Sequence, residues 1–567
     1  SAYFDDEITA MPNLVTVGAA ATASSVAGVT VYTADSSIYI GADVSGTDDT
    51  AEHNVAVGVS ALDAITTGDK NIAIGRNAGG ALNTGDRNVF IGDSSGDAAT
   101  DAQYNVGIGN DAMTSLTSGH SNTAVGLNTH AALTTGDYNI AIGRQAADGF
   151  DTEDHNLAIG MDALGGSVAG GEQNIAVGNY TLDALTSGDG NTVMGYQAGT
   201  GLTTGTDNVL VGRTAGGTGA MTGDFNTFVG TGIGGNNALT SAEQNVCIGR
   251  EAAYFGTSFN SSVLVGHAAG KSMTTGAEIV AVGRNAYTNA DTEAHNLAIG
   301  SSALNGSVAG GEYNVAVGNY TLDALTSGDN NVAVGYNAAT SITTSSMNTI
   351  MGDAAGALLA TGDGRNTIIG KDCFNAGTYT LQTGNNNIAL GERCKVSATD
   401  ANFQFVIGSN VTSNGNSTTT IGYDTTEIAT NHGSASWAAV SDERYKKDIE
   451  DSTAGLSFIN DLRPVTFKFK QKNELDTDLY GYDANSTDTD GYTDEVAHGF
   501  IAQEIKTAID NHTEIKAGQE IWKESPEAKG KRQNVSHIGM IPMLVKALQE
   551  ADDKIDALTA RVTTLEG

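Results

Sequence analysis

The sequence predicts a mainly β fold: a β-solenoid, or β-roll, shaft with coils of about 17 residues, then an α+β domain that ends in a coiled-coil helix. Three observations predict it. The pattern Asn-φ-small-φ-Gly, with φ an aliphatic residue, recurs at a nearly fixed interval. Composition changes at residue 440, because residues 1–440 hold 65 of the 73 glycines but one of the four prolines. Residues 541–566 carry apolar side chains at heptad spacing.

The glycines that close the pattern, here called marker glycines, set the coil length. They run from Gly41 to Gly408, and of their 21 intervals 15 are 17 residues and four are 18. Three alternating positions before each glycine indicate a short strand. Stacked at about 4.8 Å per coil, these units make a rod on the order of 100 Å long. Residues 151–198 and 291–338 are near copies, which indicates a duplication of eight coils.

Each coil has further expected features. The turn before the strand often reads Thr/Ser-Gly-Asp-x-Asn, as at Gly68, where glycine is expected to supply a positive φ. A second short strand is expected around an Ala-Leu pair. The large φ residues are expected to fill the interior, and the small ones to form a flat face toward a shared axis. The pattern therefore predicts an oligomer, with a monomeric solenoid as the alternative.

Charge excludes some partners. Residues 1–440 carry a net charge of −29 and residues 441–567 one of −9, out of −38 for the chain. So acidic a chain repels nucleic acid and anionic membranes. No stretch approaches the apolar length that spans a bilayer, so no membrane insertion is expected.

The shaft offers few candidate sites. Cys247, Cys373 and Cys394 stand where other coils have small residues, so they are expected to pack. The sequence has no HExxH or CxxC, and no transition-metal site is expected. The turn aspartates are candidates for Ca²⁺ between coils, against a solvated acidic turn. The ladder asparagines are expected to bond along the stack. A glycosidase would need two carboxylates in an aromatic-lined groove, and the rod offers no such pair.

Four segments divide the chain: an N-terminal segment (1–36), the shaft (37–408), a distal tip or neck (409–440) and a C-terminal domain (441–567). The repeat becomes irregular near residue 371. Irregular loops on a rigid scaffold are where recognition is found. Tyr423, His432 and Trp437 are therefore the candidate receptor-binding residues, with a plain neck as the alternative.

The C-terminal domain opens with Ser441-Asp-Glu-Arg-Tyr-Lys446. Together with Ile459–Phe467, His498–Ile505 and Met540–Leu548, this run resembles the intramolecular chaperone of phage tail fibres, tailspikes and endosialidases, the S74 peptidase family. The resemblance implies cleavage between Val440 and Ser441, with Ser441 as the nucleophile and Lys446 as its base. Asp442 and Arg444 would hold the geometry. A serine hydroxyl needs such a base, and lysine serves when nearby positive charge or burial depresses its pKa.

Apolar residues in the last helix follow steps of three and four, at positions 541, 544, 548, 551, 555, 558, 562 and 565. This spacing indicates a coiled coil over 541–566, and the family resemblance implies a parallel homotrimer. The shaft repeat resembles the head repeats of trimeric autotransporter adhesins, and more closely the 17-residue repeats of tail-fibre proteins.

The predicted function is attachment of a phage tail to its host, which places the protein in the virion tail fibre. Its expected partners are two further copies of itself, a host surface glycan or protein, and other tail proteins at the N-terminal end. A bacterial trimeric surface adhesin is the alternative, and a polysaccharide-cleaving tailspike is a third. The predicted enzymatic activity acts on this chain alone.

Overall fold

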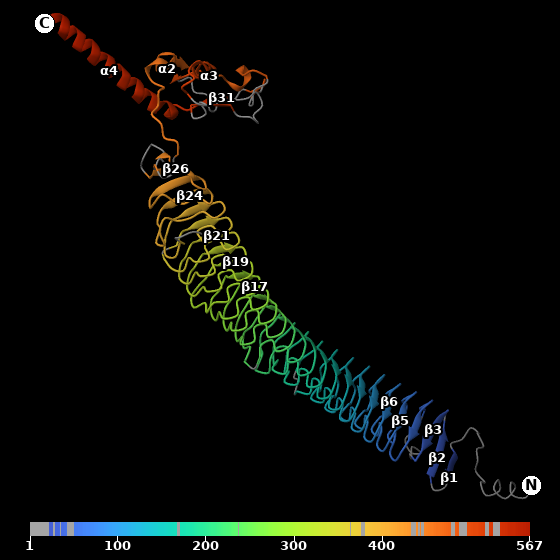
Figure 1. Ribbon diagram of the computed structural model, residues 1–567. Coiled ribbons are helices and arrows are strands. Elements are labelled where there is room, and N and C mark those ends of the chain that lie inside the picture. The colour runs from blue at the N-terminus through green and yellow to red at the C-terminus, as the bar shows by residue number, and fades with distance from the viewer. Residues whose placement is uncertain are drawn as a thin grey trace, which may run out of the picture. The chain divides into compact units, whose positions relative to one another are not determined.

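The computed structural model describes residues 22–26, 29–34, 36–41, 50–166, 170–235, 237–362, 364–375, 380–432, 438–439, 443, 447–477, 482, 484–486, 496–515, 521–524 and 533–567. The chain divides into two compact units, Ser1–Val440 and Ser441–Gly567 (Figure 1). Each is described by itself.

The described part of the first unit forms one sheet of 27 strands. They are β1 (Thr22–Val26), β2 (Val29–Ala34), β3 (Ser37–Ile40), β4 (Val55–Val57), β5 (Ile72–Ile74), β6 (Val89–Ile91), β7 (Val106–Ile108), β8 (Thr123–Val125), β9 (Ile140–Ile142), β10 (Leu157–Ile159), β11 (Ile175–Val177), β12 (Thr192–Met194), β13 (Val209–Val211), β14 (Thr227–Val229), β15 (Val246–Ile248), β16 (Val263–Val265), β17 (Val280–Val282), β18 (Leu297–Ile299), β19 (Val315–Val317), β20 (Val332–Val334), β21 (Thr349–Met351), β22 (Thr367–Ile369), β23 (Ile388–Leu390), β24 (Gln404–Ser409), β25 (Thr418–Tyr423), β26 (Thr426–Asn431) and β27 (Ala438–Ala439).

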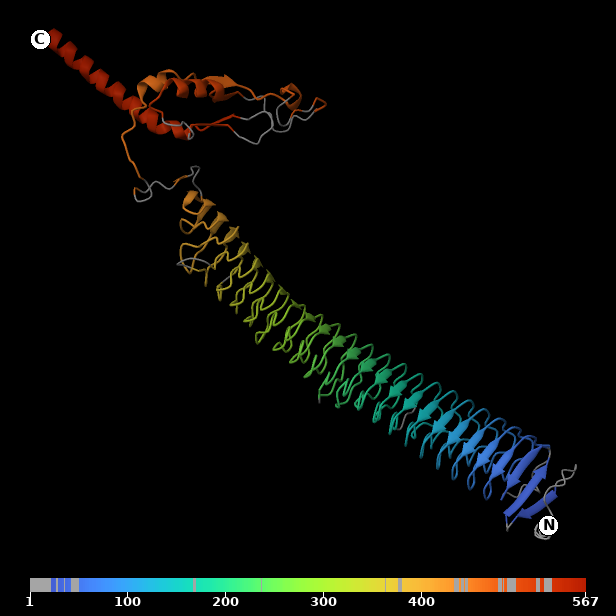
Figure 2. The same ribbon diagram turned by 45° about the vertical axis from the view of Figure 1, so that its right-hand side comes forward.

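The predicted β-solenoid is confirmed. From β3 to β25 each strand pairs in parallel with the next, and the strands line up in one column (Figure 2). Antiparallel pairing occurs at the two ends, in β1–β2–β3 and in β25–β26–β27. The expected second strand is wrong: the Ala-Leu segment is a turn in which Leu62 has a φ of 52°. Each coil therefore contributes one strand.

The two faces of each strand are the reverse of the expected ones. In β5, Ala73 is fully buried, whereas Ile72 and Ile74 are 37% and 39% exposed. Every three-residue strand from β4 to β23 likewise buries its middle residue. Turn residues such as Leu62 and Leu82 already fill the interior, which leaves room for a small middle side chain in most coils. The large residues, and not the small ones, form the external face.

In many coils two interior side chains have complementary volumes. The middle strand residue faces the fourth residue after the marker glycine, here called the turn slot. In several coils a large middle residue stands opposite glycine in the turn slot, and a Cβ on Gly96 would lie 2.5 Å from the ring of Phe90. Ile368 with Phe374 is an exception. In other coils a small middle residue stands opposite a large turn slot, as in Ala56 with Leu62, whereas Ala141 and Ala147 are both small. Both arrangements fill one space to native density.

The predicted asparagine ladder is confirmed. The backbone N–H of Asn71 donates to Asn54 Oδ1 at 2.8 Å, and its side-chain amide donates to the carbonyl of Gly85 at 2.9 Å. The amide of Asn88 then donates to Asn71 Oδ1 at 3.0 Å. Asparagine at this position therefore satisfies buried backbone groups of neighbouring coils, which are costly to leave unpaired.

The explanation expected for the turn glycine is wrong. The left-handed residue is the one before each ladder asparagine, as in Lys70 with a φ of 60°. A Cβ on Gly68 would instead lie 2.4 Å from the carbonyl oxygen of Gly85. Glycine is required here because the next coil approaches so closely.

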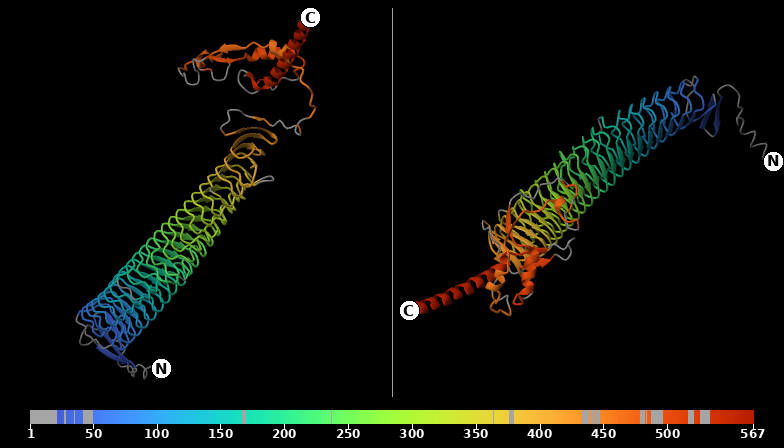
Figure 3. Two further views of the ribbon diagram at one scale, coloured as in Figure 1. Left: turned by 90° about the vertical axis from the view of Figure 1, so that its left-hand side faces the viewer. Right: turned by 90° about the horizontal axis from the view of Figure 1, so that it is seen from above.

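The second unit is a small α+β fold. Its elements are α2 (Leu456–Asn460), β28 (Val465–Phe467), the 3-10 turn η2 (Lys472–Glu474), β29 (Ala497–Gly499), α3 (Ala502–Asn511), β30 (Trp522–Glu524), β31 (Gln533–Val535), the 3-10 turn η3 (Ile538–Met540) and α4 (Ile541–Glu566) (Figure 3). β28 pairs with β29 and β30 with β31, both antiparallel. The core gathers around Phe458, Ile505 and Met540.

We expect the pair Phe90 and Gly96 to be exchangeable for a small–large pair. Gly96→Leu alone forces a side chain into the Phe90 ring and should destabilise this coil by about 3 kcal/mol. Phe90→Ala combined with Gly96→Leu reproduces the Ala56–Leu62 arrangement and should recover most of that loss. Hydrogen exchange of peptides covering residues 89–108 measures both. Equal protection loss in the single and double variants contradicts the volume balance.

His130 occupies a turn slot, is fully buried, and its ring nitrogens have no hydrogen-bond partner in the described structure. Burial lowers its pKa to about 4. An unfolded histidine titrates near 6.5, so between about pH 6.5 and pH 4 the unfolded state binds more protons. Stability should therefore fall by on the order of 3 kcal/mol as the pH drops through this range.

His130→Leu should remove that pH dependence and raise stability at pH 7 by about 1–3 kcal/mol, because it removes a buried unsatisfied group. Hydrogen exchange around residues 120–150, at pH 7 and at pH 5, is the measurement. His155→Gln is the control. It replaces an exposed histidine with the residue found at the corresponding position 173, and it should keep the wild-type pH dependence. A His130→Leu chain that weakens in acid like the wild type refutes the assignment.

Candidate functional site

The residues proposed for self-cleavage, Val440, Ser441, Asp442, Arg444 and Lys446, lie outside the residues that the structure describes. Their geometry therefore stays a prediction. The unit boundary falls between the first two of them.

Two of the three receptor-binding candidates are described, and Trp437 lies outside the described residues. Tyr423 ends β25 and is 71% exposed. His432 follows β26, with its Nε2 3.3 Å from Thr419 Oγ1. Because Tyr423 pairs with Thr426 near the turn of the β25–β26 hairpin, it lies at the opposite end from His432. The structure does not bring these two side chains together.

Two motif segments of the second unit lie side by side. Thr466 in β28 pairs with His498 in β29. Arg463, just before β28, forms a two-pronged ion pair with Glu504 in the first turn of α3, one prong being Nε to Oε2 at 3.0 Å. The hydrogen bond with Glu504 raises the pKa of Arg463 and that with Arg463 lowers the pKa of Glu504. This pair joins the segment before β28 to the first turn of α3.

His512 links two elements of the core. Its Nε2 lies 2.8 Å from Asp461 Oδ2, and its Nδ1 lies 2.7 Å from Glu514 Oε1. The ring also packs edge-on against Phe458. Imidazolium donates from both nitrogens, so two carboxylate partners favour the protonated form. The hydrogen bond to Asp461, then that to Glu514, raise the pKa of His512.

Helix α4 has one packed end and one exposed end. Near its start, Ala547 is buried, and Glu550 Oε2 accepts the N–H of Leu456 at 2.8 Å, which caps α2. The heptad residues form an exposed stripe, here called the heptad row. Apart from the half-buried Ala551, they are 46–85% exposed: Ile541, Leu544, Leu548, Ile555, Leu558, Val562 and Leu565. Such a stripe is the form that a coiled-coil seam takes in a single chain.

The shaft carries a second apolar surface, here called the outward row: the first and third residues of β4 to β23. Of its 40 positions, 35 are Val, Ile, Leu or Met, five are Thr and none is charged. Ile140 and Ile142 are 41% and 40% exposed, which is typical of the row. Contiguous apolar patches of more than a few hundred Å² mark interaction surfaces. The sequence pattern revealed the alternation but not which side faces outward.

The remaining shaft candidates make contacts within the chain. The three cysteines are free and fully buried, as predicted. Burial raises the pKa of the Cys247 thiol. The turn aspartates accept backbone N–H groups of the preceding coil, as Asp69 does from Glu52 and Asp86 from Asp69, both at 2.7 Å.

Metal centres and membrane spans are both absent from the part of the chain that the structure describes. Its residues hold no group of three or more His, Cys, Asp or Glu side chains arranged for a metal ion. None of its helices has the length and apolar character needed to cross a membrane.

Comparison with known families gives one match. Residues 441–514 match the model of the Peptidase_S74 family, described as chaperone of endosialidase. The β-solenoid is thus followed by a C-terminal endosialidase-type chaperone domain. Searches of curated proteins and of solved structures returned no match.

The second unit should lose stability as the pH rises. The pKa of His512 is raised in the folded state. Its ion pairs therefore contribute fully to stability below the pKa of an unfolded histidine, about 6.5, and this contribution is lost as the pH rises through the folded-state pKa. Unfolding followed by the fluorescence of Trp522, in a Trp437→Phe chain, is the measurement.

His512→Gln should flatten this dependence above pH 6, and His498→Gln, at an exposed position on β29, should retain it. The same slope in both variants would mean that another group titrates.

Proposed function

We propose that the chain is a subunit of a homotrimeric fibre that attaches a phage tail to its host, and that its second unit is an intramolecular chaperone that releases itself before Ser441. The main support for this proposal is that a family boundary and a structural boundary fall at the same residue. The family match begins at residue 441, which is also the first residue of the second compact unit. A domain of this type, directly behind a long solenoid, supports a fibre that is assembled by its own C-terminal part.

The proposed cleavage of the Val440–Ser441 peptide bond uses one nucleophile and one base. The hydroxyl of Ser441 attacks the carbonyl of Val440 while Lys446 accepts its proton. The acyl group moves to the serine oxygen, and the nitrogen of Ser441 takes the proton from Lys446 and leaves as an amine. Water then hydrolyses the ester, which leaves a carboxylate on Val440. Positive charge on Arg444 and Lys447 favours the neutral, basic form of the Lys446 amine.

The heptad row supports the trimer. Its apolar residues are exposed in one chain and stand at the spacing at which helices pack around each other. Three helices joined there hold three shafts together at one end. Once the shafts have packed, release of the chaperone removes the easiest route for separating them, which is a kinetic form of stability.

The distal end of the shaft is the proposed receptor-binding region. Tyr423 ends β25, His432 directly follows β26, and Trp437 follows them in sequence. A host surface glycan or protein is the proposed ligand there, and other tail proteins are the proposed partners at the N-terminal end. The repeat pattern also supports the alternative, a bacterial trimeric adhesin with the same chaperone.

A denaturing gel tests the self-cleavage. Wild type should separate into fragments of residues 1–440 and 441–567, whereas Ser441→Ala and Lys446→Met should remain one chain of 57.8 kDa. Ser452→Ala, at an exposed serine nearby, is the matched control and should still split. Identical band patterns for wild type and Ser441→Ala refute the serine–lysine assignment.

A further inference from the structure

Two of the three cysteines occupy the same position in consecutive coils. This position, the third residue after a marker glycine, is here called the alanine slot, because alanine stands there after 13 of the 22 marker glycines. Cys373 and Cys394 stand three residues after Gly370 and Gly391. Cys247 is different, because it is the middle residue of β15. Two cysteines thus take the place of two successive alanines.

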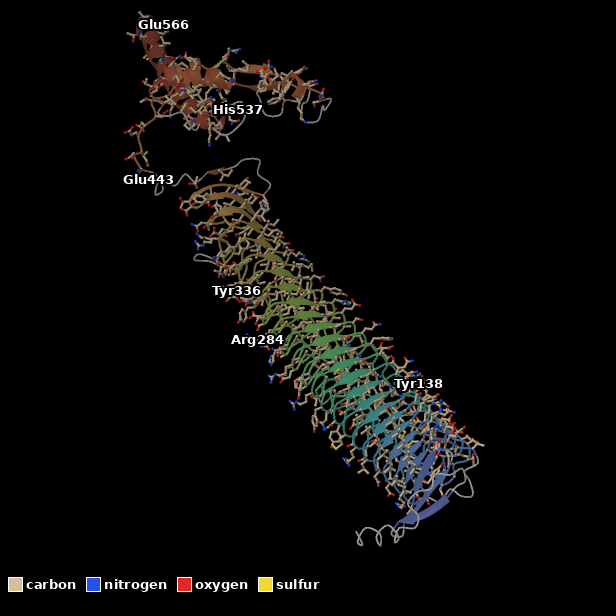
Figure 4. The ribbon with its side chains drawn as sticks, turned by 90° about the vertical axis from the view of Figure 1, so that its right-hand side faces the viewer. Tyr138, Arg284, Tyr336, Glu443, His537 and Glu566 are labelled. Atoms are coloured by element: carbon tan, nitrogen blue, oxygen red, sulfur yellow. The ribbon has the colours of Figure 1, made fainter. Side chains whose placement is uncertain are left out.

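Equivalent residues of successive coils form columns along the shaft. Figure 4 shows Arg284 and Tyr336, which each follow a marker glycine, on the same side of it. Neighbouring coils are about 4.8 Å apart. A disulfide joins Cα atoms that are roughly 4.4–6.8 Å apart. Two cysteines in the alanine slots of neighbouring coils therefore have the backbone separation that a disulfide needs.

Backbone hydrogen bonds on both sides of the slot keep these two coils in register. Before the slot, the N–H of Arg393 donates to the carbonyl of Lys371 at 2.9 Å. After it, the N–H of Phe374 donates to the carbonyl of Cys394 at 2.7 Å. Cys373 lies between these two bonds and so stands next to Cys394.

Side chains in the alanine slot point along the stack toward the following coil. The hydroxyl of Thr181 donates from this slot to the carbonyl of Gly195 in the next coil at 2.8 Å, and the thiol of Cys394 donates likewise to Gly408 at 3.3 Å. The same direction brings the thiol of Cys373 to Cys394. The hydrogen bond between the two thiols raises the pKa of Cys373 and lowers that of Cys394, so Cys373 is its donor.

We propose that Cys373 and Cys394 are a redox-controlled pair that forms a disulfide between consecutive coils under oxidising conditions. The oxidant is a low-molecular-weight disulfide. The thiolate of Cys394 attacks one of its sulfurs and releases the first small thiol. The thiolate of Cys373 then attacks the sulfur of Cys394 and releases the second. The two protein thiols lose two electrons and two protons, and one small disulfide becomes two small thiols.

The disulfide closes the coil that departs most from the repeat. The interval from Gly370 to Gly391 is 21 residues, the longest of the 21 intervals. A bond from Cys373 to Cys394 spans this coil and restricts the conformations that it reaches when it opens, which favours the closed coil. Both side chains are fully buried, so the closed coil shields the bond from reducing thiols. This role is separate from the proposed function, because it concerns one chain only.

Cys247 is a control within the same chain. It is also fully buried, but its register partners in the neighbouring coils are Phe228 and Leu264. A small disulfide that reaches Cys247 can therefore only cap it. Modification of Cys247 also reports that the interior of the shaft has opened to the reagent.

Mass spectrometry of the full chain tests the pairing, with oxidised glutathione as the probe. The chain is incubated with it at stepwise higher temperature, and the remaining thiols are blocked with iodoacetamide in denaturant. Trypsin then releases the two cysteines in separate peptides, residues 372–393 and 394–395. These peptides should be joined by a disulfide before Cys247 carries glutathione. Cys373 and Cys394 still free when Cys247 is modified, or each capped by its own glutathione, overturn the proposal.

Hydrogen exchange tests the effect on the coil. Peptides within residues 367–394 should exchange at least tenfold more slowly in the oxidised than in the reduced chain. Cys373→Ala and Cys394→Ala introduce the commonest residue of the slot and should abolish this difference, whereas Cys247→Ala should keep it. Equal exchange in oxidised and reduced wild type, or an unchanged difference in Cys373→Ala, overturns the proposal. Neither result depends on cleavage before Ser441.

Discussion

Backbone hydrogen bonds between successive coils are the constraint on which the rest of the shaft depends. The N–H of Val55 donates to the carbonyl of Asn71, and that of Gly75 donates to the carbonyl of Val57, both at 2.9 Å. Such bonds form only when equivalent residues of successive coils lie next to each other. The strand and the positions on either side of it therefore have no room for an inserted residue. Where a coil has an extra residue, a loop absorbs it. After Gly160 the carboxylate of Glu153 accepts the N–H of Gly170 at 2.9 Å and so closes the longer coil.

Packing in the shaft is local as a result. The contacts that balance Phe90 against Gly96 lie within one coil, and the asparagine ladder joins only neighbours. A stack of this kind behaves as a one-dimensional chain of units, each stabilised by its own core and by two interfaces. Local packing does not specify how far one whole shaft lies along another. The outward row has the same limitation, because the same pattern of residues recurs in every coil.

The sequence pattern predicted the coil period, the strand in each coil and the asparagine ladder, because each depends on residues within one repeat. It did not predict the side of the strand that faces inward, since alternation shows two faces but not which one the turn residues cover. The large interior residues responsible, such as Leu62, lie in the turn. In the second unit the heptad row follows from local spacing. The Glu550 cap of α2 and the Asp461–His512 pair join residues 94 and 51 positions apart, and no local pattern indicates them.

The antiparallel strands at the two ends of the sheet affect how the fibre grows. A parallel stack with an open final strand presents a row of free N–H and C=O groups, on which another stack could continue. At one end β26 turns back on β25, and at the other β2 turns back on β3, so the parallel ladder of the solenoid ends in antiparallel pairing on both sides. The strands left at the two edges, β1 and β27, again run in the direction of the stack, but neither is the strand of a regular coil, so another stack meets no matching coil there. The number of stacked coils is therefore fixed by the sequence of one chain, without end-to-end addition of further stacks.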